Sequence, residues 1–118
     1  MDPWDPGPVT RLVLAILQVA VQKGARGVEM IDQPEALRAP IALHIDGEWV
    51  PHMLPPYKLR DAMAESLATL AELDLERTSS GNFELSIDGI SYRVDVKLGL
   101  GLTPSVFRVG IRPMLKLV

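Results

Sequence analysis

The sequence contains no cysteine, only two histidines and few aromatic residues, which make up 5% of the chain. The absence of cysteine excludes disulfide bonds and thiolate metal sites. It also fits a reducing compartment, and the acidic, proline-rich start is unlike a signal peptide, so we expect a cytoplasmic protein. His44 and His52 are predicted to point to opposite sheet faces or to lie far apart, and we therefore expect no metal site.

The sequence also lacks an excess of basic residues and a long apolar run. The formal net charge is −3, and no cluster of Lys and Arg forms the basic patch that nucleic-acid binding normally needs. The longest apolar run, residues 12–22, is too short to span a bilayer and is interrupted by Gln18. We therefore expect neither nucleic-acid binding nor direct insertion into a membrane.

Motifs that bring catalytic groups together are not found. There is no G-x-x-x-x-G-K-[ST] loop, and Gly99-Leu100-Gly101 lacks the third glycine and the following helix of a dinucleotide-binding loop. Asp46 and Asp88 belong to predicted turns, which their side chains stabilise by hydrogen bonds. We therefore predict no catalytic residue, no cofactor and no enzymatic activity.

The residues that are present predict one globular domain, because the chain has 118 residues, of which 47% are hydrophobic. Apolar residues at spacings of three and four predict a helix over residues 9–23, which Pro8 begins and Gly24 ends. A second helix is predicted over residues 57–73, after Pro55-Pro56.

Two Asp-Gly pairs predict two hairpins, because both central positions of a type I′ turn need positive φ. In the first hairpin, the strand of residues 41–45 turns at Asp46-Gly47, and Pro51 marks the returning strand as an edge. The second hairpin turns at Asp88-Gly89, with apolar pairs on one face and an ion pair on the other. Its predicted cross-strand pairs are Ile87 with Ile90, Leu85 with Tyr92, Phe83 with Val94, and Glu84 with Arg93.

Short strands over residues 28–31 and 106–111 complete the order α-β-β-β-α-β-β-β, which is like that of PAS domains. The predicted fold is α+β, with two main helices packed on an antiparallel sheet of about five to six strands. The predicted organisation is an irregular arm over residues 1–8, a single domain over residues 9–113 and an apolar tail over residues 114–118.

Several residues are candidates for binding a protein partner. Trp4 either packs on its own domain or anchors a partner. The basic residues of the C-terminal strands, which include Lys97, either gather into a positive patch on one sheet face or are neutralised by neighbouring acids. The tail is predicted to cover a sheet edge or to pair with a second molecule, and the strand with Pro51 and the C-terminal strand are the predicted edges. The candidate residues are Trp4, Arg77, Arg93, Arg108, Arg112, Leu115 and Leu117.

A series of short segments follows in a fixed order along the chain. They are Gly24-Ala25, Ile45-Asp46-Gly47, Leu54-Pro55-Pro56, residues 67–75, Gly81-Asn82-Phe83, residues 92–96, Leu102-Thr103-Pro104 and Arg112. In order and spacing they resemble the domain that directly precedes the motor domain in type II secretion and type IV pilus assembly ATPases. The resemblance covers nearly the whole chain, from about Arg11 to Arg112, and implies a role in assembly.

The sequence departs from that family where the family carries arginines. Arginines of the resembled domain help the nucleotide site of a neighbouring subunit. Here the linker of residues 76–82 has Asn82 where the family has an arginine, and only Arg77 remains. Asparagine cannot supply a delocalised charge to a phosphate. The nucleotide-binding domain is also missing from the sequence, so ATP hydrolysis is not expected.

The resulting prediction is a non-catalytic protein–protein interaction or assembly module. Its partner would be a motor subunit, another copy of itself or a membrane-assembly protein. One alternative is a PAS-like small-molecule sensor with a pocket between sheet and helix, although no polar groups converge on the predicted inner face. Another is a small acidic secretion chaperone. Whether the chain stands alone or is part of a longer ATPase is left open.

Overall fold

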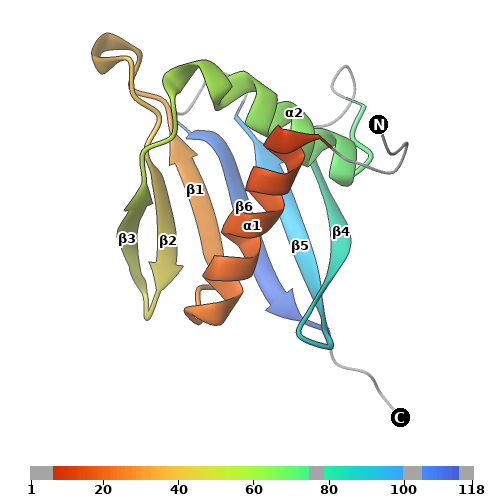
Figure 1. Ribbon diagram of the computed structural model, residues 1–118. Helices are drawn as coiled ribbons and strands as arrows, with labels where there is room; N and C mark the ends of the chain where they lie inside the picture. Colours follow the sequence, from red (N-terminus) through yellow and green to blue (C-terminus); the bar gives the residue numbers. More distant parts are fainter. Residues whose placement is uncertain (1–6, 75–78, 100–104, 115–118) are drawn as a thin grey trace.

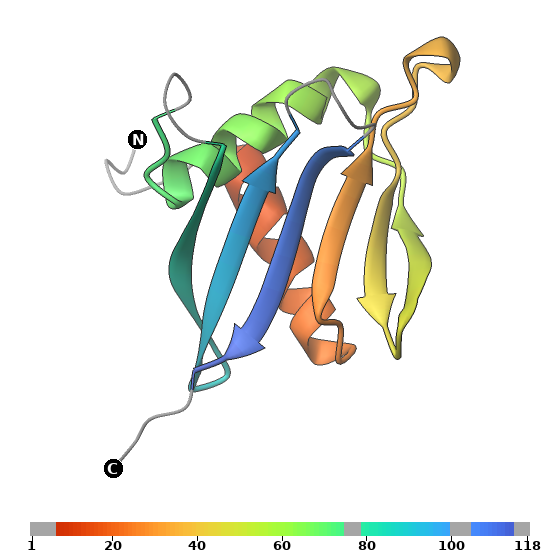
Figure 2. The ribbon, with the colours of Figure 1, turned by 180° about the vertical axis from the view of Figure 1, so that it is seen from behind.

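The computed structural model describes residues 7–74, 79–99 and 105–114, which form an antiparallel sheet and a layer of two helices (Figure 1). The element order is α-β-β-β-α-β-β-β, as predicted, with two short 3-10 turns added. Both helices lie against the same face of the sheet, and no described helix covers the other (Figure 2). We call this uncovered side the open face.

The first helix, α1 (Pro8–Gln22), begins with Pro8, whose missing N–H has no cost in the first turn. Gly24 follows the helix with a φ of 74°, and its N–H donates to the carbonyl of Val21 at 3.0 Å. A left-handed residue at this place ends a helix, so the predicted cap is confirmed. The buried stripe of α1 consists of Val13, Ile16, Leu17 and Ala20.

The first hairpin turns at Asp46-Gly47, where φ is 51° and 82°, as predicted for a type I′ turn. Pro51 lies in the returning strand, which forms an edge of the sheet, and this prediction is confirmed. The elements of this half are β1 (Gly27–Ile31), the 3-10 turn η1 (Pro34–Ala36), β2 (Ile41–Ile45) and β3 (Glu48–Met53).

The second helix is shorter than the predicted span of residues 57–73. A 3-10 turn, η2 (Tyr57–Leu59), precedes α2 (Arg60–Leu70). Glu72 takes a φ of 53°, and the N–H of Leu73 donates to the carbonyl of Ala68 at 2.8 Å. This geometry turns the chain out of the helix, so the predicted end is wrong.

The second hairpin has the predicted register, with Asp88 and Gly89 at φ values of 50° and 79°. Ile90 was predicted to join the buried row, but 49% of its surface is exposed. It lies at the turn, opposite Ile87, which is buried, so only one member of this pair joins the core. The three strands of this half are β4 (Ser80–Ile87), β5 (Ile90–Leu98) and β6 (Ser105–Pro113).

The strand order is β3-β2-β1-β6-β5-β4, so β6 joins the two hairpins into one sheet. Because β6 pairs with both β1 and β5, the prediction that the C-terminal strand is an edge is wrong. The edges are β3 and β4. The predicted edge assumed that the last strand pairs only with its neighbour in sequence, whereas its other side pairs with the first strand.

The core lies between the helices and the sheet. Its described part contains a cavity of about 10 Å³, roughly the space of one water molecule. A small-molecule sensor would need a preformed pocket of about 300 Å³ or more, so this cavity is too small to be the pocket of the sensor alternative. The largest fully buried side chains are Leu17, Met30, Ile41, Leu43, Met63, Leu67, Val28, Val94, Val96 and Val109.

Candidate interaction surface

The open face is built from alternate residues of every strand, because successive side chains of a strand point to opposite faces. The cross-strand register defines rows that run across all six strands. One row contains Trp49, His44, Gly27, Gly110, Asp95 and Asn82. The next row contains Pro51, Ala42, Glu29, Arg108, Lys97 and Ser80.

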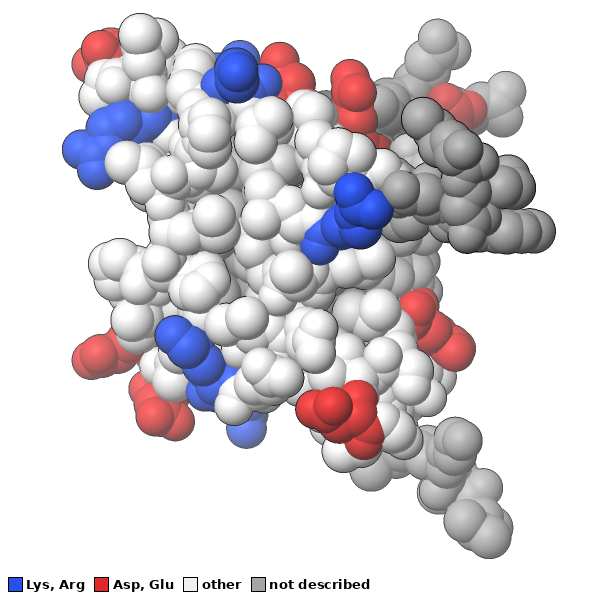
Figure 3. Space-filling view, viewed as in Figure 1, with Lys and Arg blue, Asp and Glu red and all other residues white. Residues whose placement is uncertain are grey.

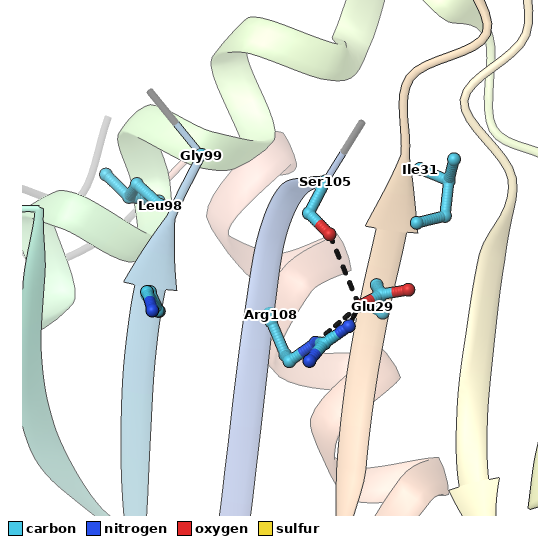
Figure 4. A pocket seen from close by; sticks show the side chains of 7 residues that line it. Glu29, Ile31, Leu98, Gly99, Ser105 and Arg108 are labelled. Carbon is cyan, nitrogen blue, oxygen red and sulfur yellow. Dashed lines mark hydrogen bonds and ion pairs between the residues drawn. The ribbon is translucent and has the colours of Figure 1, made fainter. Parts of the chain in front are cut away.

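Glu29 lies in the middle of the open face, and its side chain is only 10% exposed. Its carboxylate accepts hydrogen bonds from the guanidinium of Arg108 and, at 3.3 Å, from the hydroxyl of Ser105 (Figure 4). Together with Lys97 and Gly99, these residues line an open cleft of about 360 Å³. Sequence spacing gives no sign of the Glu29–Arg108 pair, because the two residues are 79 positions apart.

The four basic residues of the C-terminal strands, Arg93, Lys97, Arg108 and Arg112, share the open face. The guanidinium of Arg93 donates to the carboxylate of Asp95 at 3.2 Å, and Arg112 lies 3.6 Å from the same carboxylate. The two alternatives from the sequence, a shared patch and neutralisation by neighbouring acids, are therefore both partly correct. The four residues share one face, and acids neutralise part of their charge. That this patch binds a partner stays a prediction.

Trp49 adds an aromatic wall beside this patch. Its ring lies 4.9 Å from the ring of His44, and the guanidinium carbon of Arg108 lies 5.6 Å from the centroid of the Trp49 ring. The ring reaches across β2 toward Gly27, and 41% of the residue's surface is exposed. Trp49 was not among the predicted site residues, although its place opposite His44 follows from the hairpin register.

The other predicted binding residues belong to the N-terminal arm, the linker after α2 and the C-terminal tail. Trp4, Arg77, Leu115 and Leu117 lie outside the described residues. The described chain ends at Met114, whose N–H donates to the carbonyl of Ser91 at 2.8 Å. The predicted role of the tail therefore stays a prediction.

A second polar cluster connects the end of β1 to the start of α2. The hydroxyl of Tyr57 donates to the carboxylate of Asp32 at 2.8 Å, and the guanidinium of Arg60 donates to the same carboxylate at 3.2 Å. Partial burial and the hydrogen bond to Asp32 raise the pKa of Tyr57 above its ordinary value of 10.0. A hydrogen bond to Asp61 raises the pKa of Arg60. Because these groups form hydrogen bonds with one another, we infer that the cluster stabilises the fold.

The helix-covered side presents mostly uncharged surface, with most Lys, Arg, Asp and Glu side chains near its margins (Figure 3). In the described parts of the chain, no group of three or more His, Cys, Asp or Glu residues could hold a metal ion. A bilayer crossing would need a longer apolar helix than any found among the described residues.

The chain is similar to the type IV pilus assembly ATPase PilB of Myxococcus xanthus (strain DK1622), with 33% identity over 111 residues. The similarity covers 94% of this chain but only 18% of the length of PilB. It lies in the N-terminal region of PilB and not in the motor domain. No family model matches the chain. The similarity supports the resemblance to a domain of pilus and secretion ATPases, and it concerns a small part of such a protein.

Proposed function

We propose that this chain is a non-catalytic assembly module of a pilus or secretion machine and that it holds a protein partner against the open face of its sheet. The similarity to the N-terminal region of a pilus assembly ATPase supports the assignment to such a machine. The docking role depends on one observation, which is a six-stranded face without helix cover that carries exposed arginines and Trp49.

The open face has properties that favour docking. Its central strands pack on the opposite side against the core, so the side chains project from a rigid platform. A rigid platform reduces the conformational entropy that is lost on binding. Arginine and tryptophan are also the residue types that most often dominate binding energy at protein interfaces.

The proposed partner is a motor component of the PilB type, and the proposed location is the cytoplasm. A chain without cysteine suits that reducing compartment. The chaperone alternative would gain support if the chain instead captured an unfolded segment of a secreted protein. The sensor alternative receives no support from the described core, whose cavity is about 10 Å³.

The test is a calorimetric titration of the chain with full-length PilB of Myxococcus xanthus. Arg112→Glu reverses a charge on the open face and should abolish binding. It loses the exposed ion pair with Asp95, which contributes little to stability, and gains a favourable pair with Arg93 across the strands, so it should not unfold the chain. The matched control is Gln18→Glu, which adds the same side chain to the exposed side of α1 and should leave binding intact. No binding of the unchanged chain, or loss of binding only with Gln18→Glu, would contradict the proposal.

A further inference from the structure

The open face contains two cross-strand pairs of like charge. Lys97 on β5 lies opposite Arg108 on β6, and Arg93 lies opposite Arg112. Like charges directly opposite each other destabilise a sheet. Between the two pairs, Gly110 lies opposite Asp95. We call this patch the basic saddle: Arg93, Lys97, Arg108 and Arg112 around Gly110.

The basic saddle is not fully neutralised. The carboxylates beside it are Glu29, Asp95 and Glu84, so four cations against three carboxylates leave a charge of +1, in a chain whose net charge is −3. No carboxylate among the described residues forms an ion pair with Lys97. The side chains of Arg108 and Arg112 are 58% and 62% exposed, so their charges are accessible to a partner.

The fold does not explain Gly110. This glycine has no positive φ and lies in a continuous stretch of the register, and an added Cβ would lie no nearer than 3.9 Å to another side chain. Gly27 differs, because a Cβ there would lie 3.0 Å from the carbonyl oxygen of Val109. A glycine inside a strand weakens it, and where no bulge or bend is present it marks a place that a ligand or another backbone approaches closely.

We infer that the basic saddle binds an acidic segment of the partner protein, with a bulky side chain of that segment seated over Gly110. This inference rests on the proposed docking function and gives the chemistry of its partner. Arg108, Gly110 and Arg112 alternate along β6 and span about 13 Å at roughly 3.3 Å per residue. An extended segment with an acid, a bulky apolar residue and an acid at alternate positions has the matching spacing.

A protein segment fits better than a phosphate polymer. Asp95 lies opposite Gly110, between the two pairs of cations. A phosphate polymer would place negative charge at this position, whereas the proposed segment places an apolar side chain there. Gly27, directly opposite Gly110, extends the floor of the saddle toward the exposed ring of Trp49. An apolar side chain would meet a backbone floor and an aromatic wall there, whereas a phosphate would not use either.

The test uses a short fluorescein-labelled peptide with the pattern Glu-x-Phe-x-Glu, in which x is a small neutral residue. Its binding is measured by fluorescence anisotropy at low ionic strength. The chain should bind this peptide, and added salt should weaken the binding. Replacing the glutamates by glutamine should abolish binding, and replacing phenylalanine by glycine should weaken it. Binding of inorganic polyphosphate in preference to the peptide, or no binding of the peptide, would overturn the inference.

Two variants separate the basic saddle from the rest of the open face. Gly110→Val should abolish peptide binding, because its branched side chain fills the seat over the backbone. It should also raise the melting temperature, because valine favours strands and a Cβ at this position meets no atom nearer than 3.9 Å. The matched control, Ser86→Val, adds similar bulk on the exposed surface of β4, which β5 separates from Gly110, and should not affect binding. If Gly110→Val unfolds the chain, the glycine is structural and the inference fails.

These results are distinguishable from a failure of the proposed function. Binding of PilB with no effect of Gly110→Val would refute the inference and leave the docking role intact. Peptide binding that is lost in Gly110→Val, with no binding of PilB, would retain the acidic-segment site and refute the assignment of the partner.

Discussion

Replacement of Arg108 by methionine should destabilise the chain because it leaves Glu29 without its positive partner. The side chain of Glu29 is 10% exposed, whereas that of Arg108 is 58% exposed. A hydrogen bond to a charged group contributes about 1.5–3 kcal/mol. Because the arginine end of the pair is solvated and Ser105 still donates to the carboxylate, we expect the lower part of this range, about 2 kcal/mol.

The assay is urea denaturation monitored by circular dichroism. The slope of the unfolding free energy against urea concentration should be the same for the variant and the unchanged chain. The matched control is Arg93→Met, which removes a cation from the same face. Its pair with Asp95 is 44% exposed on both sides, so the cost should be about 0.5 kcal/mol or less.

The double variant Glu29→Gln with Arg108→Met completes the comparison. Glutamine removes the buried charge that Arg108 neutralises, so the double variant should be more stable than the sum of the two single changes predicts, by about 1 kcal/mol. The reasoning is refuted if Arg108→Met costs no more than Arg93→Met, because Glu29 would then be solvated in spite of its position in the cleft.

Three further changes test other parts of the fold. Gly99→Ala should cost about 1–3 kcal/mol, because a Cβ would lie 1.7 Å from the carbonyl oxygen of Ser105; unchanged thermal unfolding would disprove this close approach. The pKa of Tyr57 is raised in the folded chain. Its contribution to folding stability is therefore fully present below the pKa of the unfolded chain and is lost as pH rises through the pKa of the folded chain. The unchanged chain should therefore lose more stability than Tyr57→Phe between about pH 8 and about pH 11, and equal losses in urea unfolding would count against the bond to Asp32. Leu67→Ala removes a side chain that is 1% exposed and should cost about 2–5 kcal/mol; a smaller loss in urea unfolding would mean that α2 packs loosely.

Local patterns predicted the hairpins well. Asp46-Gly47 and Asp88-Gly89 both adopt the positive φ values that their residue types favour, and the alternation of apolar residues then sets the register. The helix caps were less predictable. Gly24 ends α1 as expected, but Glu72 takes a positive φ that its residue type does not indicate, and α2 is therefore shorter than its pattern.

Contacts between distant strands were not predictable from one sequence. No local signal shows that β6 pairs with β1, so the central position of β6 and the pairing of Glu29 with Arg108 appear only in the fold. The basic residues were grouped from the sequence because all four fall in the C-terminal strands, and a shared sheet face was one of two alternatives for them. The binding role inferred for Gly110 depends on the free space around its Cα, which the sequence alone does not show.

The central claim is that the chain holds its partner through the open face. The most direct measurement is a titration of the isotope-labelled chain with full-length PilB, in which the NMR signals of the side-chain N–H groups are monitored. The account predicts that the indole signal of Trp49 and the guanidinium signals of Arg93 and Arg112 shift or disappear first. Changes confined to the side-chain amides of Gln18 and Gln22, on the exposed side of α1, would contradict it.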